Sequence, residues 1–170
     1  SGKVLNEYGR FPCKIQCGVY AFMIKGTARA TVNITQLDFR ENDLIYLAPN
    51  SFFLVHEFSE DAQLLYIVFS SAFLEKNTYS IRRPRLVMSE ACKIVNATAE
   101  QTSIIRKFYD MIDAAVNCTP SMLNSERMVH VHNLIYMIFQ DYFVSNSDDT
   151  SKSRIISFSS DLYTPDLIQP

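Results

Sequence analysis

Short runs of apolar and β-branched residues recur from Cys17 to Leu74, and polar turn residues separate them. Residues 28–35 alternate between apolar and polar side chains, which indicates a strand with one buried and one solvated face. The same spacing predicts strands at 18–25, 28–35, 37–40, 43–48, 52–58 and 62–70, with one more at 86–88. Short strands joined by turn residues are typical of an antiparallel sandwich or a small barrel. Such a barrel either fills its interior with side chains or encloses one small ligand, and the pattern leaves both open.

Beyond residue 90 the apolar period changes from 2 to about 3.6, which indicates helices. Residues 99–117 place a continuous apolar stripe on one helix face. Thr98 and Gln101 have the spacing of a capping box at the start of this helix. The pair Thr119-Pro120 suits the N-cap and first position of a second helix. The sequence therefore predicts two antiparallel helices joined by a short connection.

The second helix carries an apolar stripe that is wider than a lone surface helix needs. Packing against the barrel accounts for each residue of the stripe, and a subunit interface is the sharper alternative. Leu134, Met137 and Phe139 widen the stripe. The candidate interface residues recur at three- and four-residue spacing and are Met128, Val131, Ile135, Ile138 and Tyr142.

Composition and charge argue for an ordinary globular protein of the cytosol. The 170 residues, 48% hydrophobic and 20% charged, suffice for one domain or for one domain with a helical appendage. A formal net charge of −2 gives no basic footprint, so this chain alone is not expected to bind DNA. No apolar run reaches about 18 residues and no signal peptide opens the chain, so the sequence predicts neither secretion nor a membrane span. Four scattered cysteines without a CxxC pair indicate reduced thiols.

Neither a metal centre nor a catalytic constellation is evident in the sequence. A metal-binding cupin barrel needs several converging imidazoles and a carboxylate, and of the three histidines only His56 lies in the strand region. His130 and His132 are two residues apart on the second helix and point about 200° apart, so they do not clamp one ion. No G-x-S-x-G elbow occurs, and four glycines are too few for a phosphate loop. We therefore expect no enzyme activity, no metal and no cofactor.

The order and spacing of several short motifs resemble those of a known family. The motifs are Tyr20 with Lys25-Gly26, Ala30-Thr31-Val32-Asn33, Glu41-Asn42-Asp43-Leu44-Ile45-Tyr46-Leu47-Ala48-Pro49-Asn50, Ser59-Glu60-Asp61, and Phe69-Ser70 with Phe73-Leu74. In their order and spacing the chain resembles the N-terminal sensor domain of AraC-type transcriptional regulators, in particular the short-sensor kind of Bacteroides-like bacteria. The similarity covers roughly residues 10–145.

The resemblance implies a mainly β fold with a helical appendage. Residues 3–90 are expected to form a cupin-like antiparallel β-barrel, a double-stranded β-helix or jelly roll that binds an effector. Residues 98–145 are expected to form a helical dimerisation hairpin. Residues 146–170 would be a linker and the start of a C-terminal helix-turn-helix DNA-binding domain that is missing from this chain.

The function that the resemblance implies is effector sensing and dimerisation. The chain would form a cytoplasmic homodimer, and an unknown small molecule bound in the barrel would alter how the dimer presents its DNA-binding domains. DNA would be bound only through the missing C-terminal domain, and no membrane would be involved. A small cupin-fold enzyme and a structural dimerisation domain without a ligand are the alternatives.

Few polar groups in the strand region are available to a ligand, because residues 52–58 are strongly apolar. A register error of one residue exchanges the two faces of a strand, so the pattern does not establish which side chains point inward. The candidate barrel-lining residues are Tyr20, Phe22, Arg29, Tyr46, His56 and Tyr66.

Overall fold

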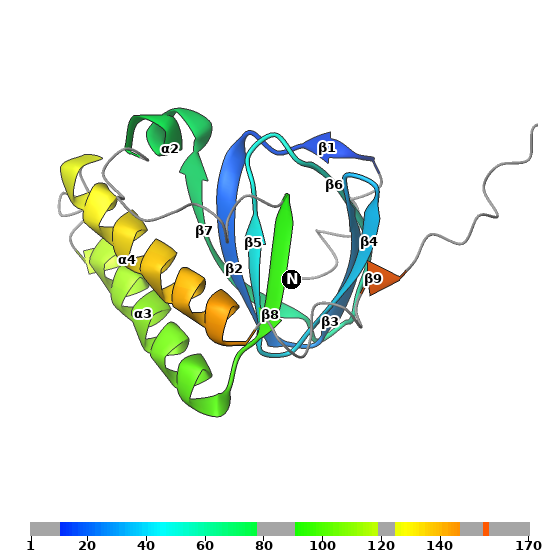
Figure 1. The fold of residues 1–170 in the computed structure, drawn as a ribbon. Coiled ribbons are helices and arrows are strands. Elements are labelled where there is room, and N and C mark those ends of the chain that lie inside the picture. The colour runs from blue at the N-terminus through cyan, green and yellow to red at the C-terminus, as the bar shows by residue number, and fades with distance from the viewer. Residues whose placement is uncertain (1–10, 78–90, 119–124, 147–154, 157–170) are drawn as a thin grey trace, which may run out of the picture.

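Two antiparallel β-sheets face each other, and two long helices lie across the outer face of one of them (Figure 1). The computed structural model describes residues 11–77, 91–118, 125–146 and 155–156. The four-stranded sheet contains, in spatial order, β7 (Gln63–Ser70), β2 (Cys17–Lys25), β5 (Asp43–Leu47) and β8 (Cys92–Asn96). The five-stranded sheet contains β1 (Cys13–Lys14), β6 (Phe52–Phe58), β3 (Thr27–Val32), β4 (Thr35–Arg40) and β9 (Ile155–Ile156). The helices are α2 (Ser71–Asn77), α3 (Ala99–Cys118) and α4 (Ser125–Ser145).

The order of the strands is that of a jelly roll. In one sheet β2 lies between β7 and β5, and in the other β3 lies between β6 and β4, so the chain winds back and forth between the two sheets. All of the strand pairs are antiparallel. This arrangement is one of the standard solutions for packing two antiparallel sheets around a shared interior. The predicted fold class, mainly β with two helices, is confirmed.

Residues with positive φ make the tight turns between successive strands. Asn33, Asn42 and Asn50 have φ of 56°, 68° and 67°, a region that asparagine tolerates better than other residues with a Cβ. Gly26 has φ of 80° between β2 and β3. A Cβ at Gly26 would clash with Ser59 Oγ and lie 2.7 Å from the Ala62 Cα, so only glycine fits this turn.

The described strands follow the predicted ones closely, but the short strand β1 was not predicted and there are further differences. The predicted strand at 28–35 is divided by the turn at Asn33, so β3 ends at Val32 and β4 begins at Thr35. Strand β8 was not predicted; it pairs along its whole length with β5. Helix α2 was not predicted either. The predicted strand at 86–88 lies outside the described residues.

The two long helices match the prediction. Helix α3 begins at Ala99, after a capping box in which the Thr98 backbone N–H donates to Gln101 Oε1 at 2.9 Å and the Gln101 N–H donates to Thr98 Oγ1 at 3.3 Å. Helix α4 runs from Ser125, and the predicted cap at Thr119-Pro120 lies outside the described residues. In the tail, Ile155 and Ile156 are extended and pair with β4, although the sequence suggested a helix start in this segment. No helix in the described part of the chain combines the length and apolarity needed to cross a membrane.

The hydrophobic core is divided in two by the four-stranded sheet. One cluster lies between the two sheets and includes Ala21, Met23, Ala30 and Ile45. The other lies between the four-stranded sheet and the helices, and it is richer in aromatic residues. Strand β2 contributes to both clusters from its opposite faces, so it is the wall that separates them.

Candidate functional site

A cavity of about 870 Å³ lies between the two sheets. Its volume is within the range of small-molecule binding sites, which is about 300–1,000 Å³. Small side chains on facing strands leave the space open: Ala21 on β2 and Ala28 and Ala30 on β3. The side chains of the described residues therefore leave room for a ligand, which favours the second of the two alternatives that the sequence left open.

The cavity wall is apolar. Among the described lining residues only Gln63 and Tyr66 have side chains with hydrogen-bonding atoms. The other lining residues are Ile15, Val19, Ala21, Met23, Ile24, Ala28, Ala30, Phe39, Ile45, Leu47, Phe53, Val55, Phe58, Ala62, Leu64, Leu65 and Val68. Such a wall favours an apolar molecule, because a polar ligand would lose its hydrogen bonds to water without replacement.

The cavity opens to solvent along β7, which is an edge strand of its sheet. Tyr66 and Val68 belong to the cavity lining and yet are 64% and 45% exposed. Lining residues on the neighbouring strand β2, such as Ala21 and Met23, are fully buried by contrast. The strand β7 therefore forms the rim of the cavity.

Tyr66 is one of the predicted lining residues, and it lies at this rim. Arg29 and His56 lie elsewhere, in the five-stranded sheet with their side chains outside the cavity. The guanidinium of Arg29 pairs with Asp38 at 2.8 Å and with Glu57 at 3.2 Å. The ring of His56 is hydrogen-bonded to the Thr31 hydroxyl, with Nε2 and Oγ1 2.7 Å apart. Both residues thus have polar partners on the outer face of the sheet.

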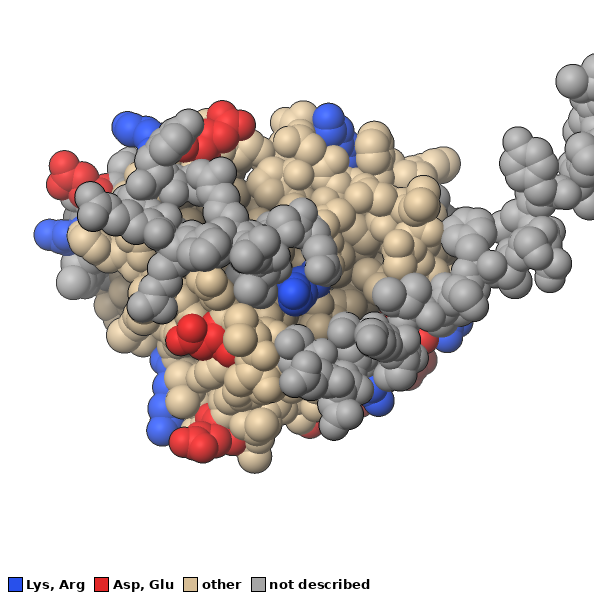
Figure 2. Space-filling model, viewed as in Figure 1, with Lys and Arg blue, Asp and Glu red and all other residues tan. Residues whose placement is uncertain are grey.

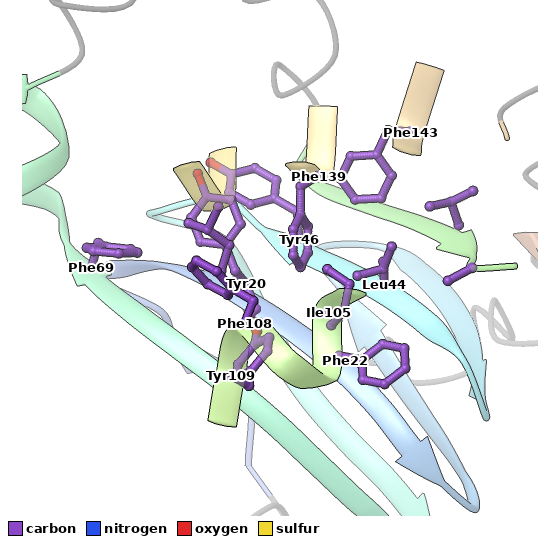
Figure 3. Close-up of a cluster of buried hydrophobic side chains, with 13 residues drawn as sticks. Tyr20, Phe22, Leu44, Tyr46, Phe69, Ile105, Phe108, Tyr109, Phe139 and Phe143 are labelled. Atoms are coloured by element: carbon purple, nitrogen blue, oxygen red, sulfur yellow. Dashed lines mark hydrogen bonds between the residues drawn. The ribbon is translucent and has the colours of Figure 1, made fainter. Parts of the chain in front are cut away.

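Tyr20, Phe22 and Tyr46 do not line the cavity. Their side chains point to the opposite face of the four-stranded sheet, where they meet helices α3 and α4 (Figure 3). The Tyr20 ring packs edge-on against Phe139 of α4, with centroids 5.2 Å apart. Residues of β2 alternate between the two faces, so the placement of Tyr20 in the helical core puts Ala21 in the cavity.

Tyr20 also connects β2 to both long helices by polar contacts. Its backbone carbonyl accepts a hydrogen bond of 2.7 Å from the hydroxyl of Tyr109 on α3. Its own hydroxyl oxygen lies 3.4 Å from Nε2 of His132 on α4, with the direction of donation depending on the histidine tautomer. Burial raises the pKa of Tyr20 and Tyr109 well above the usual range, so both stay neutral hydroxyl donors at physiological pH.

His132 is the buried histidine of this aromatic core. It is only 3% exposed and is surrounded by the rings of Tyr20, Phe69, Phe73 and Tyr136. Its Nδ1 has no hydrogen-bond partner among the residues that the structure describes. Burial lowers the pKa of His132, and the side chain of Asn133 opposes that shift in part. The ring is therefore neutral in the folded protein near pH 7.

This burial predicts a pH dependence of stability. The pKa of His132 is lower in the folded than in the unfolded chain, where it is near 6.5, so its contribution is complete above that pH. As the pH falls below 6.5 the unfolded chain binds the proton first, and stability decreases by at most about 1.4 kcal/mol per pH unit. Urea unfolding of wild type and His132→Gln between pH 7.5 and 5 measures how the free energy of unfolding changes with pH, and the change should be smaller in the variant.

The exposed neighbour His130 provides the control, and His130→Gln should show the same pH dependence of the free energy of unfolding as wild type. The same pH dependence in His132→Gln as in wild type would contradict the prediction.

The predicted interface residues of α4 mostly face inward. Ile135 is completely buried, whereas Met128, Val131, Ile138 and Tyr142 are partly buried against the helical core. The apolar residues that α4 exposes lie on its other side: Leu134, Met137 and Val144, at 45%, 52% and 58%. Helix α3 exposes Ile104, Met111 and Val116. We call Leu134, Met137 and Val144 of α4 the outer helical face.

The face of the molecule drawn in Figure 2 shows neither a positively nor a negatively charged patch among the described residues. In Figure 2 the basic and acidic residues that the structure describes are interspersed, and neither sign gathers into a patch. Within the described residues no group of three His, Cys, Asp or Glu side chains is arranged to hold a metal ion. The four cysteines are free thiols, with Cys13 and Cys118 exposed.

The fold and the cavity together define a jelly-roll domain with an apolar internal site and a packed pair of helices. No family model matches the sequence, and no curated protein matches it significantly. Two solved structures that the chain resembles in fold are of ToxT from Vibrio cholerae. The apo ToxT K231A structure has a TM-score of 0.49 and 12% identity over 81% of this chain. ToxT bound to (E)-4-(8-methylnaphthalen-1-yl)but-3-enoic acid has a TM-score of 0.43 and 12% identity over 75% of this chain. The match spans half the length of each of those proteins.

Proposed function

We propose that this chain is the effector-sensing and dimerisation domain of an AraC-type transcriptional regulator of the cytoplasm. A small molecule binds in the cavity between the sheets, and the helices pair two copies of the chain. DNA is bound by a separate helix-turn-helix domain of the full-length regulator. The observation that carries the proposal is the cavity of about 870 Å³, which a purely structural domain would not need.

Strand β2 supplies the means of coupling the cavity to the helices. Ala21 lines the cavity, and the adjacent Tyr20 contacts both α3 and α4. A ligand that shifts β2, or that binds only when β2 is in one position, therefore also changes how α3 and α4 pack on the sheet. A ligand with different affinities for two such arrangements shifts the equilibrium between them.

Filling the cavity is the test of ligand binding. Ala30 is 1% exposed and lines the cavity, so the ring in Ala30→Phe would occupy the space of a ligand. We expect this variant to lose at least tenfold in affinity for the neutral apolar dye Nile red, measured by fluorescence titration. The control Ala72→Phe makes the same change at an exposed position of α2 and should bind like wild type. Equal binding by all three proteins would contradict the proposal, provided that each unfolds cooperatively on heating.

The outer helical face is the proposed dimer surface. Leu134 and Met137 are adjacent on the exposed side of α4. Exposing two apolar side chains destabilises a lone chain little, whereas burying them between two chains stabilises a dimer. We expect the double variant Leu134→Asp, Met137→Asp to be a folded monomer where wild type is a dimer, as measured by light scattering after gel filtration. Ile34→Asp changes a 79% exposed apolar residue outside the helices and should stay dimeric. A dimeric double variant, or a monomeric wild type, would exclude this surface.

A further inference from the structure

Among the described residues that line the cavity, polar side chains occur only near its rim, and this distribution restricts the chemistry of the ligand. No charged side chain occurs among these residues. In the five-stranded sheet, Arg29 pairs with Asp38 and Glu57 on the outer face. The other wall has the apolar helical core behind it. A charge placed inside would therefore meet no counter-charge from the described lining residues.

A carboxylate or ammonium group is bound poorly in such a place. Moving a charge from water to an apolar site without a partner favours the neutral form, so a buried acid binds protonated and a buried amine binds deprotonated. Above its own pKa an acid then loses about tenfold in affinity for each pH unit, because only the declining neutral fraction binds. A neutral molecule of the same shape has no such penalty.

The rim offers one hydrogen-bonding side chain on the cavity face of β7. Tyr66 shares this face with the lining residues Leu64 and Val68, and it is 64% exposed. Gln63 comes three residues earlier on the strand, so its side chain lies on the opposite face. A phenol both donates and accepts hydrogen bonds. The cation nearest in register is Lys25, which pairs with Gln63 across the strands and whose ammonium lies 3.3 Å from the Asp61 carboxylate.

From this arrangement we propose that the cavity takes an uncharged, largely apolar molecule with one hydrogen-bonding group, such as an alcohol, ketone or ester, held at the β7 rim by Tyr66. The inference rests on the proposed function, because it assigns a ligand class to the same cavity. It separates this site from one for sugars, which need several polar partners inside, and from one for carboxylates, which need a cation.

Two ligands of the same length test the assignment. 1-Decanol and decanoic acid are titrated against the Nile red complex at pH 7.5, 6.75 and 6.0. We expect decanol to displace the dye at a concentration at least tenfold lower than decanoate at pH 7.5. Decanoate should tighten by about tenfold per pH unit as the pH falls, whereas decanol should change little. Decanol thus controls for any effect of pH on the protein itself.

The opposite result has its own signature. Decanoate that binds as tightly as decanol at pH 7.5, and that weakens in Lys25→Met, would show a carboxylate held by a cation and would overturn the assignment. If neither compound displaces the dye, or if Ala30→Phe leaves dye binding unchanged, the proposed function itself fails. The two failures are therefore distinguishable.

The rim residue is tested with a variant that removes its polar atom. Tyr66→Phe should weaken decanol binding about fivefold, the size expected from losing a hydrogen bond. Toluene, which has no hydrogen-bonding group, should bind this variant as it binds wild type. Unchanged decanol affinity in the variant would contradict the placement of the ligand's polar group at β7.

Discussion

Phe139→Ala is expected to destabilise the domain by about 3–5 kcal/mol, because it removes a fully buried ring from the centre of the helical core. Phe139 packs edge-on against Tyr20 of β2 and against Phe143 one turn further along α4, with centroids 5.2 and 5.7 Å apart. Tyr20 belongs to the sheet and Phe143 to the helix, so they do not move together to fill the cavity that the missing ring leaves. Urea unfolding measured by circular dichroism gives the free energy.

The comparison with Leu134→Ala on the same helix makes this result specific. Leu134 is 45% exposed, so its truncation should change the free energy of unfolding by less than about 0.5 kcal/mol when measured below the concentration at which chains associate. A loss under about 1 kcal/mol in Phe139→Ala would mean that α4 is not seated on the sheet as described. A large loss shows that the helices are part of one cooperative unit with the four-stranded sheet.

Asp43→Ala is expected to cost about 2–4 kcal/mol, because it leaves two hydrogen-bond donors without their acceptor. The carboxylate of Asp43 is completely buried at the start of β5. It accepts a bond of 2.8 Å from the Arg40 backbone N–H and one of 2.9 Å from the side-chain amide of Asn96 on β8. It thereby holds together the β4–β5 turn and the end of β8.

Graded substitutions test this assignment of Asp43. Asp43→Asn keeps one carbonyl acceptor and should lose about half as much stability, as measured by the same urea titration. The exposed Glu60 of the β6–β7 turn is the control, and Glu60→Ala should unfold at the same urea concentration as wild type. Equal midpoints for Asp43→Ala and wild type would contradict a structural role for the buried carboxylate.

The sequence predicts the strands well where one face of a strand is wet, and poorly where both faces are buried. Strand β3 alternates between cavity-facing alanines and polar outward residues, so its character is readable. Strand β2 is apolar on both faces, because one faces the cavity and the other the helices. No local period then tells which of Tyr20 and Ala21 points inward, and only the packing of α3 and α4 decides it.

For the same reason, the sequence does not separate the buried from the exposed apolar residues of α4. The apolar stripe of α4 is continuous in sequence, and the completely buried Ile135 is adjacent to the 45% exposed Leu134. The direction in which the helix is seated on the sheet separates inner from outer residues, and that direction depends on partners far away in sequence. Strand β8 is missed for a related reason, since its five residues form a strand by pairing with β5.

Isotope-filtered NMR with 1-decanol bound to methyl-labelled protein tests the central claim most directly, namely that the space between the sheets is the ligand site. The methyl groups of Ala21, Ala30 and Val19 face the cavity, whereas those of Val131 and Ile135 lie in the helical core. We predict nuclear Overhauser contacts from the decanol chain to the first three residues and none to the last two. Contacts confined to the helical residues, or no contacts at saturating decanol, would contradict the account.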